Sequence, residues 1–278
     1  MGDIKSLSSR YFDNNANEYT RDYYISQVTH PKWQRQHAIE KIIKKFIKPS
    51  SSKILNLGCG PGLLEEALSK QGYSGIGIDS SPEMIALSID RSKKNNFNEN
   101  WKFLVRDCEE TKIDNTKFDC IVASGLIEYM PEDEKLLKES YRLLKNDGLL
   151  ILNVTNIFGW STCLNRFTHY FKKIDKFIAI ANFIKKRVFH EDIKAKRLDF
   201  VPRKHVPFLF LKKTKKINFD FVTALYQGFT LLPAPLDLII NLFPGNLNSK
   251  LEFLQNTPLK YFGASYLIVL KKKYKANA

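Results

Sequence analysis

Three glycines and one aspartate stand where they could bind a small polar ligand. Gly58, Gly60 and Gly62 follow a short apolar run and come just before a helical segment. Glycines in such a turn let the chain bend sharply and let a ligand reach main-chain N–H groups that a side chain would shield. Asp79 ends the next apolar run, where a carboxylate can accept hydrogen bonds from both hydroxyls of a ribose.

The spacing of these glycines narrows the kind of ligand. A nicotinamide-dinucleotide fingerprint places glycines at i, i+2 and i+5, so that a pyrophosphate meets the N-terminus of the helix. Here the glycines stand at i, i+2 and i+4. The pattern therefore favours a nucleoside ligand without phosphate.

Alternating strands and helices must position these residues. After a helix over residues 30–48, the apolar patterns predict strands at 53–57, 75–79, 101–106, 118–124 and 149–154, with helices at 62–71, from Pro82, and at 132–144. Repeated β-α units of this length require right-handed crossovers onto a mostly parallel sheet. The fold class is therefore α/β, a doubly wound sheet with helices on both faces.

The pattern changes after Asn156. Residues 219–232 and 261–270 are predicted as an antiparallel pair that closes the edge of the sheet. The intervening aromatic and basic residues form a helical insertion after the fifth strand. Four segments are expected: an N-terminal helical cap (1–50), a ligand-binding core (51–156), a basic amphipathic insertion or lid (157–205), and a C-terminal part that completes the sheet with substrate-side helices (206–278).

Five ordered motifs carry a resemblance to a known family. They are ILNLGCGPG at 54–62, GIGIDSS at 75–81, RDCEE at 106–110, FDCIVASGLIEYM at 118–130 and LLKNDG at 143–148. In order and spacing they resemble the motifs of class I S-adenosylmethionine-dependent methyltransferases. The opening Arg10-Tyr11-Phe12-Asp13 with Tyr19 resembles the start of small-molecule methyltransferases of quinone and biotin biosynthesis. The resemblance implies a seven-stranded, Rossmann-like methyltransferase fold and S-adenosyl-L-methionine as cofactor.

The resemblance also implies roles for individual residues. Gly58, Cys59 and Gly60 would pack under the methionine part of the cofactor. Asp79 would bind the ribose, and Asp107 would accept from the adenine amino group. The other cofactor-binding candidates are Asn56, Gly62, Ser80, Met84 beside the adenine, the Cys108 N–H, and Ser124 and Gly125 at the sulfonium end. The family usually has an acidic residue where Asn56 stands, although an amide oxygen can still accept a bond from the cofactor ammonium.

Charge is distributed unevenly along the chain. Basic and acidic residues balance over residues 1–155, so the whole excess of +15 lies in the C-terminal part. A lopsided basic surface indicates an anionic partner. Within residues 157–188, apolar positions three to four apart alternate with lysines. This segment is interpreted either as a helix that contacts an anionic membrane surface or as a lid that packs on its own domain; a third interpretation is that the lysines bind RNA.

Methyl transfer needs an acceptor held in line and shielded from water, and not an elaborate catalytic set. We expect O-methylation of a small lipophilic or lipid-linked acceptor near a membrane, with C-methylation as the less favoured reaction. If the acceptor is a hydroxyl, the weak candidates for a base are Tyr129, His169, His190 and His205. The alternatives are an RNA methyltransferase, with nucleic acid the less favoured partner, and a non-catalytic cofactor-binding adaptor.

The cysteines and the apolar segments indicate in which cellular compartment the protein is expected. The four cysteines show no C-x-x-C pair and no metal-ligand spacing, so no metal site is expected. No apolar stretch has the length of a membrane span, and residues 1–13 lack the apolar region of a secretory signal. The expectation is a cytoplasmic protein, with peripheral membrane contact if the basic segment binds lipid.

Overall fold

The computed structural model describes residues 4–25, 31–114, 117–163, 200–229 and 251–274. The predicted basic helix lies largely outside these residues, as do His169 and His190. The chain folds as two compact units, one of residues 1–154, 200–225 and 267–278 and one of residues 155–199 and 226–266. Among the described helices, none has both the length and the apolar character needed to cross a bilayer.

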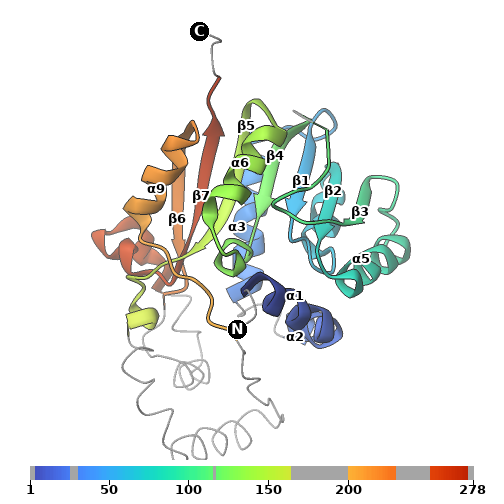
Figure 1. Ribbon diagram of the computed structural model, residues 1–278, viewed down its shortest axis with the longest axis horizontal. Helices are drawn as coiled ribbons and strands as arrows, with labels where there is room; N and C mark the ends of the chain where they lie inside the picture. The colour runs from blue at the N-terminus through green and yellow to red at the C-terminus, as the bar shows by residue number, and fades with distance from the viewer. Residues whose placement is uncertain (1–3, 26–30, 115–116, 164–199, 230–250, 275–278) are drawn as a thin grey trace, which may run out of the picture. The chain divides into compact units, whose positions relative to one another are not determined.

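Seven strands form one sheet in the order β3-β2-β1-β4-β5-β7-β6 (Figure 1). The strands are β1 (Lys53–Leu57), β2 (Ser74–Asp79), β3 (Trp101–Val105), β4 (Phe118–Ala123), β5 (Leu144–Thr155), β6 (Phe219–Gln227) and β7 (Ser265–Lys272). The first five pair in parallel. The fold class predicted from the alternating pattern is confirmed.

The last two strands run antiparallel to their neighbours. The Lys273 N–H donates to the Asn218 carbonyl, and the Ala264 N–H donates to the Gly228 carbonyl, so residue numbers rise in one strand as they fall in the other. The predicted antiparallel pair is confirmed, but β7 begins four residues later than predicted, at Ser265. The cause is a short 3-10 helix, η3 (Pro258–Phe262), which starts with a proline and is capped by the Thr257 hydroxyl.

Strand β5 begins at Leu144, five residues earlier than predicted. Its register against β4 shifts between Phe118 and Cys120. Residues 145–148 bulge out there, with Asp147 in the left-handed conformation (φ 63°). The strand begins earlier than predicted because a bulge allows the ladder to continue on both sides.

Helices cover both faces of the sheet, with α3 (Pro31–Phe46) behind it and α6 (Asp133–Leu143) in front (Figure 1). The α3 side chains Ile39 and Ile43, together with Ile47 just beyond the helix, are buried at helical spacing against strand residues such as Ile54 and Val122. The remaining elements are α1 (Ile4–Asn14), α2 (Ala16–Ile25), α4 (Leu63–Ser69), α5 (Pro82–Lys94), α9 (Pro207–Lys216), η1 (Ile127–Tyr129) and η2 (Leu251–Asn256). Helix α1 lies at the edge where the parallel strands end.

Candidate cofactor site

The turn after β1 is shaped by its glycines. Gly58, Gly60 and Gly62 all have positive φ (70°, 55° and 76°), a conformation that L side chains rarely adopt. The Gly58 and Cys59 N–H groups donate to the Ile78 carbonyl, at 2.8 and 2.9 Å, which folds the turn onto β2. A Cβ on Gly60 would meet no atom within 4 Å. Gly60 therefore borders open space.

Gly62 has a different role. It precedes α4 as the N-cap residue, and a Cβ there would lie 3.0 Å from the Ser88 Cβ on α5. It is not among the residues that line either hollow described below. The predicted ligand contact of Gly62 has no support in this arrangement, because its missing side chain makes room for helix packing.

Asp79 lies at the end of β2, facing the glycine turn. Its Oδ2 accepts a hydrogen bond from the Gly60 N–H (2.9 Å), and its Oδ1 accepts one from the Ser81 N–H (3.0 Å). The Ser81 hydroxyl in turn caps α5 by accepting from the Met84 N–H, as the sequence predicted. Burial raises the pKa of Asp79, and the backbone hydrogen bonds from Ser81 and Gly60 oppose that effect.

A cavity of about 740 Å³, counting its open mouth, lies at the ends of the first four strands. Its lining includes most of the predicted residues: Gly58, Gly60, Asp79, Ser80, Met84, Asp107, Cys108, Ser124, Gly125 and Tyr129. The structure thus brings together residues from four of the five motifs, and their roles as ligand contacts stay predictions.

A second hollow adjoins the first and shares Gly58, Gly60 and Ser124 with it. Asn56 and Cys59 line it, which places the other two predicted residues. The Asn56 side chain is buried, and its Oδ1 has no hydrogen-bond partner. An unpaired buried acceptor costs free energy, so a ligand that donates to Oδ1 would fit this position.

The sequence analysis missed Arg35 of α3, which lines the second hollow. Its guanidinium lies 3.1 Å from the position of a Cβ on Gly125. Only the folded chain brings α3 against the end of β4, so no local pattern marks this arginine. It supplies a cation to the hollow that Asn56 also lines.

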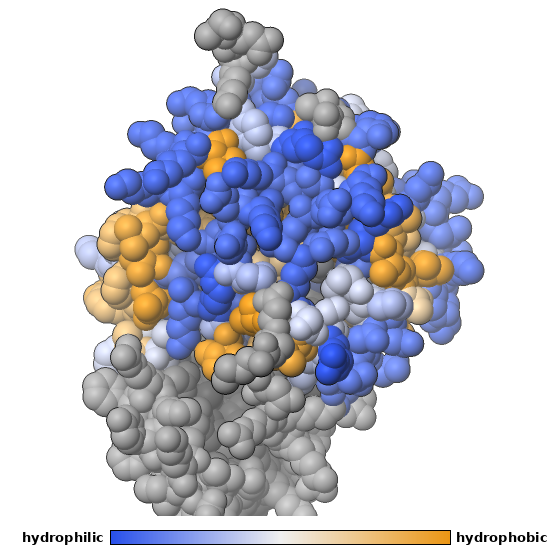
Figure 2. All heavy atoms as spheres, in the orientation of Figure 1, coloured by the Kyte–Doolittle hydropathy of each residue, from blue (hydrophilic) through white to orange (hydrophobic). Residues whose placement is uncertain are grey.

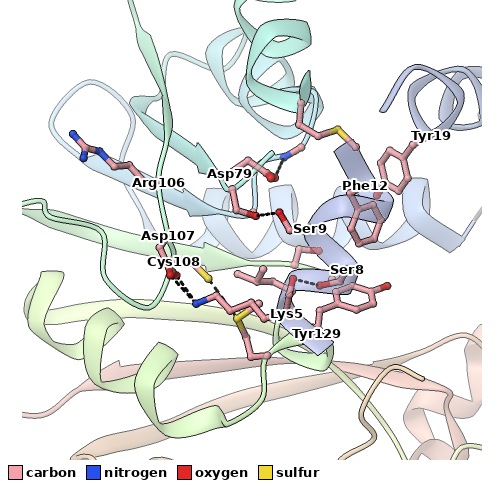
Figure 3. A pocket seen from close by; sticks show the side chains of 18 residues that line it. Lys5, Ser8, Ser9, Phe12, Tyr19, Asp79, Arg106, Asp107, Cys108 and Tyr129 are labelled. Carbon is pink, nitrogen blue, oxygen red and sulfur yellow. Dashed lines mark hydrogen bonds and ion pairs between the residues drawn. The ribbon is translucent and has the colours of Figure 1, made fainter. Parts of the chain in front are cut away.

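Helix α1 supplies a side of the cavity that the sequence analysis also missed. The Lys5 ammonium donates to both carboxylate oxygens of Asp107, at 2.8 and 2.7 Å, and also contacts Glu109 (Figure 3). The Ser9 and Ser80 hydroxyls lie 3.1 Å apart. Lys5 therefore pairs with the Asp107 carboxylate, to which the resemblance assigns the adenine amino group.

Aromatic side chains gather at another side of the same cavity. Phe12 and Tyr129 meet edge to face at 5.3 Å between ring centroids, as do Phe12 and Tyr19 at 5.8 Å and Tyr129 and Phe200 at 5.7 Å. Phe12, Tyr19 and Tyr129 line the cavity itself (Figure 3). We call Phe12, Tyr19, Tyr129 and Phe200 the aromatic wall.

Two of the candidate bases can now be placed. Burial and the neighbouring Glu128 carboxyl raise the pKa of Tyr129 well above its ordinary value, so this phenol stays protonated at neutral pH and is disfavoured as a base. His205 lies outside both hollows. Its Nε2 is 2.9 Å from Asp133 Oδ1, and Asp133 also pairs with Arg203 and Lys213. His205 therefore anchors α6 to the segment before α9.

The residues present fit an S-adenosylmethionine-type ligand. Gly60 leaves open space, Asn56 presents an unpaired oxygen, and the Asp79 carboxylate faces the cavity. Residues 55–152 match the protein family described as methyltransferase domain.

Relatives and solved structures agree with this match. A ubiquinone biosynthesis O-methyltransferase of Pelagibacter ubique is 36% identical over 123 residues, covering 42% of this chain and 50% of the relative. One from Coxiella burnetii is 31% identical over 116 residues, covering 42% and 49%. The chain thus spans about half the length of the curated relatives it matches.

Two solved structures share the fold. One is the magnesium protoporphyrin IX methyltransferase of Synechocystis PCC 6803 with bound SAH, at a TM-score of 0.61 and 13% identity over 98% of this chain and 100% of the other. The cyclase SpnF has a TM-score of 0.57 and 13% identity over 87% and 84%. A cyclase with this fold shows that fold alone does not set the reaction. Residues 55–152 of this chain thus carry a methyltransferase domain, and the solved structures share its fold.

Proposed function

We propose that this chain transfers a methyl group from S-adenosylmethionine to a hydroxyl of a small lipophilic acceptor. The observation that carries the acceptor class is the aromatic wall, three of whose rings, Phe12, Tyr19 and Tyr129, line the cavity together with Gly58, Ser124 and Gly125. Aromatic faces of this kind bind flat apolar molecules. The relatives named ubiquinone biosynthesis O-methyltransferase support an aromatic hydroxyl as the acceptor group.

On the donor side, we assign each role to a residue whose chemistry suits it. Asp79 accepts from the ribose hydroxyls, and Asp107 accepts from the adenine amino group. Arg35 pairs with the cofactor carboxylate, because it is the cation that lines the second hollow. The remaining contacts are Met84 and the Cys108 N–H at the adenine, Gly58 and Gly60 under the methionine part, Asn56 at the ammonium, and Ser124 and Gly125 at the sulfonium end.

When bound, the cofactor would supply a methyl group on a positively charged sulfur. The acceptor oxygen would take this methyl group as the C–S bond breaks and its electron pair stays on sulfur, and the hydroxyl proton would pass to solvent. The chain contributes positioning and exclusion of water. The aromatic wall holds the acceptor, and the protonated Tyr129 can donate a hydrogen bond to it.

The test begins with binding and ends with product. Calorimetric titration of the wild-type chain with S-adenosylmethionine should show micromolar-range binding. Incubation with phenolic quinone precursors should then yield a product heavier by one methyl group in mass spectrometry. Binding without product from any phenol would refute the acceptor class and leave the donor site standing; absence of binding to folded protein would refute the whole proposal.

We also propose that the acceptor is taken from a membrane surface. Helix α9 exposes Phe208 (64%) and Leu209 (49%) near its start, and Lys212, Lys213, Lys215 and Lys216 follow. On the face drawn in Figure 2 the surface is mostly hydrophilic, and hydrophobic side chains gather in a few separate patches. An apolar tip beside lysines suits an anionic bilayer surface.

Flotation with phosphatidylglycerol-containing vesicles tests this contact. We expect the wild-type chain to float and the double variant Phe208→Ser/Leu209→Ser to float less. Ile89→Ser is the matched control, because Ile89 is an exposed apolar residue on another helix, α5. Equal flotation of all three proteins, or none for the wild type, would remove α9 as a membrane contact.

A further inference from the structure

A buried carboxyl lies directly behind Asn56. Glu65, in the first turn of α4, accepts a hydrogen bond at its Oε1 from the Asn56 amide nitrogen, 2.7 Å away. Both side chains are buried, with 4% of Asn56 and none of Glu65 exposed. The second Glu65 oxygen, Oε2, has no partner. The pair is therefore a polar unit enclosed by the protein on the Glu65 side.

This hydrogen bond sets which way the amide points. An amide group has a donating end and an accepting end, and the carboxylate holds the donating end of Asn56. The accepting end, Oδ1, is left without a protein partner in a residue that lines the hollow shared with Arg35, Gly58 and Gly60. Asn56 Oδ1 is therefore available to accept a hydrogen bond from a ligand in this hollow.

We propose that Glu65 is a positioning residue that orients Asn56 and supplies the negative charge for the cofactor ammonium. This inference rests on the proposed function. Class I methyltransferases usually have an acidic residue where Asn56 stands. Here the acceptor stays at the end of β1, and the charge lies one side chain further back, on α4. An amide fixed by a carboxylate can receive a cationic donor nearly as a carboxylate would.

The same arrangement couples binding to a proton. Burial raises the pKa of Glu65 to about 7, against the lowering effect of the Asn56 hydrogen bond, and the negative charge of Asp79 raises it further. The buried Cys59 thiol is the other ionisable group that interacts with Glu65. An arriving ammonium favours the ionised carboxylate and lowers this pKa. Below pH 7, binding must therefore release a proton, and affinity should rise with pH until about pH 7.

Two ligands separate this role from a general role in folding. S-adenosylhomocysteine carries the ammonium, whereas 5′-methylthioadenosine keeps the adenosine and lacks the amino-acid part. Titrating both between pH 5.5 and 7.5 measures the affinity for each end of the site. Repeating the titration in buffers of different ionisation enthalpy counts the protons released.

For Glu65→Gln we expect about a tenfold loss of S-adenosylhomocysteine affinity at pH 7.5, the scale of one charge-assisted hydrogen bond. The proton release should disappear, and 5′-methylthioadenosine should bind as before. Glu66→Gln is the matched control, because the adjacent Glu66 pairs with Arg91 and Lys70. The exchange Asn56→Asp/Glu65→Gln, which moves the charge back to the strand, should restore most of the affinity.

Unchanged S-adenosylhomocysteine affinity and proton release in Glu65→Gln would overturn the inference and leave the proposed function intact. Equal losses for both ligands, with a lower melting temperature, would assign Glu65 to folding and overturn it as well. If the folded wild-type chain bound neither ligand, the proposed function itself would fail, and this inference with it.

Discussion

The donor end of the site and the aromatic wall are built in different ways. The donor end comes from the ends of neighbouring parallel strands, and its geometry depends on backbone: positive φ at Gly58 and Gly60, and main-chain N–H groups that donate to Asp79. The aromatic wall combines rings from α1, α2, η1 and Phe200, and edge-to-face ring contacts join its members. One end is fixed by backbone conformation and the other by side-chain packing.

This difference explains what each end can tolerate. A backbone site fails when a Cβ or a lost carboxylate disturbs a few specific positions. A packed wall changes shape gradually, because each ring contributes about 0.5–1.5 kcal/mol beyond its buried area. We therefore expect many chains with these motifs to bind the same methyl donor, whereas the methyl acceptor should change when the side chains of the aromatic wall change.

The largest effect is expected at Asp79. Asp79→Asn removes the charge that both ribose hydroxyls would meet, and we expect about a hundredfold weaker binding of S-adenosylhomocysteine, the cost of about 2.7 kcal/mol of charged hydrogen bonding. Calorimetric titration measures it. Asp90→Asn is the control, since Asp90 is exposed and pairs with Lys94 on the surface of α5. Binding within twofold of wild type would break the assignment of the donor end.

Gly60→Ala sharpens the comparison at the level of backbone. Gly60 has φ 55°, and a Cβ there would enter open space. Gly72 has φ 82°, but its Cβ would make an ordinary contact with Pro49 at 3.6 Å, away from the site. Both alanine variants should lose about 1–2 kcal/mol of unfolding free energy. Only Gly60→Ala should also weaken S-adenosylhomocysteine binding, about tenfold, the loss expected when a methyl group disturbs one well-made contact.

Chemical denaturation measures the first quantity and calorimetry the second. Equal affinities for the two variants would mean that the space beside Gly60 is not where the ligand lies.

The donor end was predictable because its signals are local. The glycine spacing, Asp79 after β2 and the serine cap before Pro82 are all carried by a few adjacent residues, and the structure brings them into one cavity. Lys5 and Arg35 were missed because they reach the two hollows only through tertiary packing, and Phe200 because it meets Tyr129 only in the folded chain. Glu65 looks in sequence like any acidic residue in the first turn of a helix.

The fold was predictable for a related reason. The central parallel strands β1, β4 and β5 are buried on both faces over most of their length and form apolar runs, such as residues 118–123. The errors fall where a local device overrides the pattern. The bulge at Asp147 extends β5, and the 3-10 helix that starts at Pro258 delays β7. Periodicity of apolar residues does not encode either device.

At the aromatic wall, variants of Tyr129 can distinguish a role in packing from a role in proton transfer. Because burial raises the pKa of its phenol, the group does not ionise near neutral pH. Tyr129→Phe should keep kcat within about twofold and leave the pH profile unshifted, while Tyr129→Ala should raise the acceptor KM about fivefold through lost ring contacts. Steady-state kinetics with a phenolic substrate measures both. A large kcat loss in Tyr129→Phe alone would make Tyr129 a catalytic residue and not a wall.

The smallest effect, and the only gain, is expected at Lys5. Burial lowers the pKa of the Lys5 ammonium, but its hydrogen bonds to Asp107 and Glu109 raise the pKa by more. The pKa is therefore raised overall, and Lys5 stays charged. If Asp107 receives the adenine amino group, Lys5 must first move away. Lys5→Met should therefore bind S-adenosylhomocysteine about threefold more tightly, because a partly exposed ion pair contributes at most about 1 kcal/mol.

The gain at Lys5 should shrink as salt rises, since screening already weakens the pair in the wild type. Lys70→Met, which removes an exposed pair with Glu66 on α4, should change neither affinity nor its salt dependence. Weaker binding in Lys5→Met would mean that Lys5 is part of the donor end, holding Asp107 in place for the ligand. The backbone-built region would then extend to a side chain of α1, and the division between the two ends would have to be redrawn at Asp107.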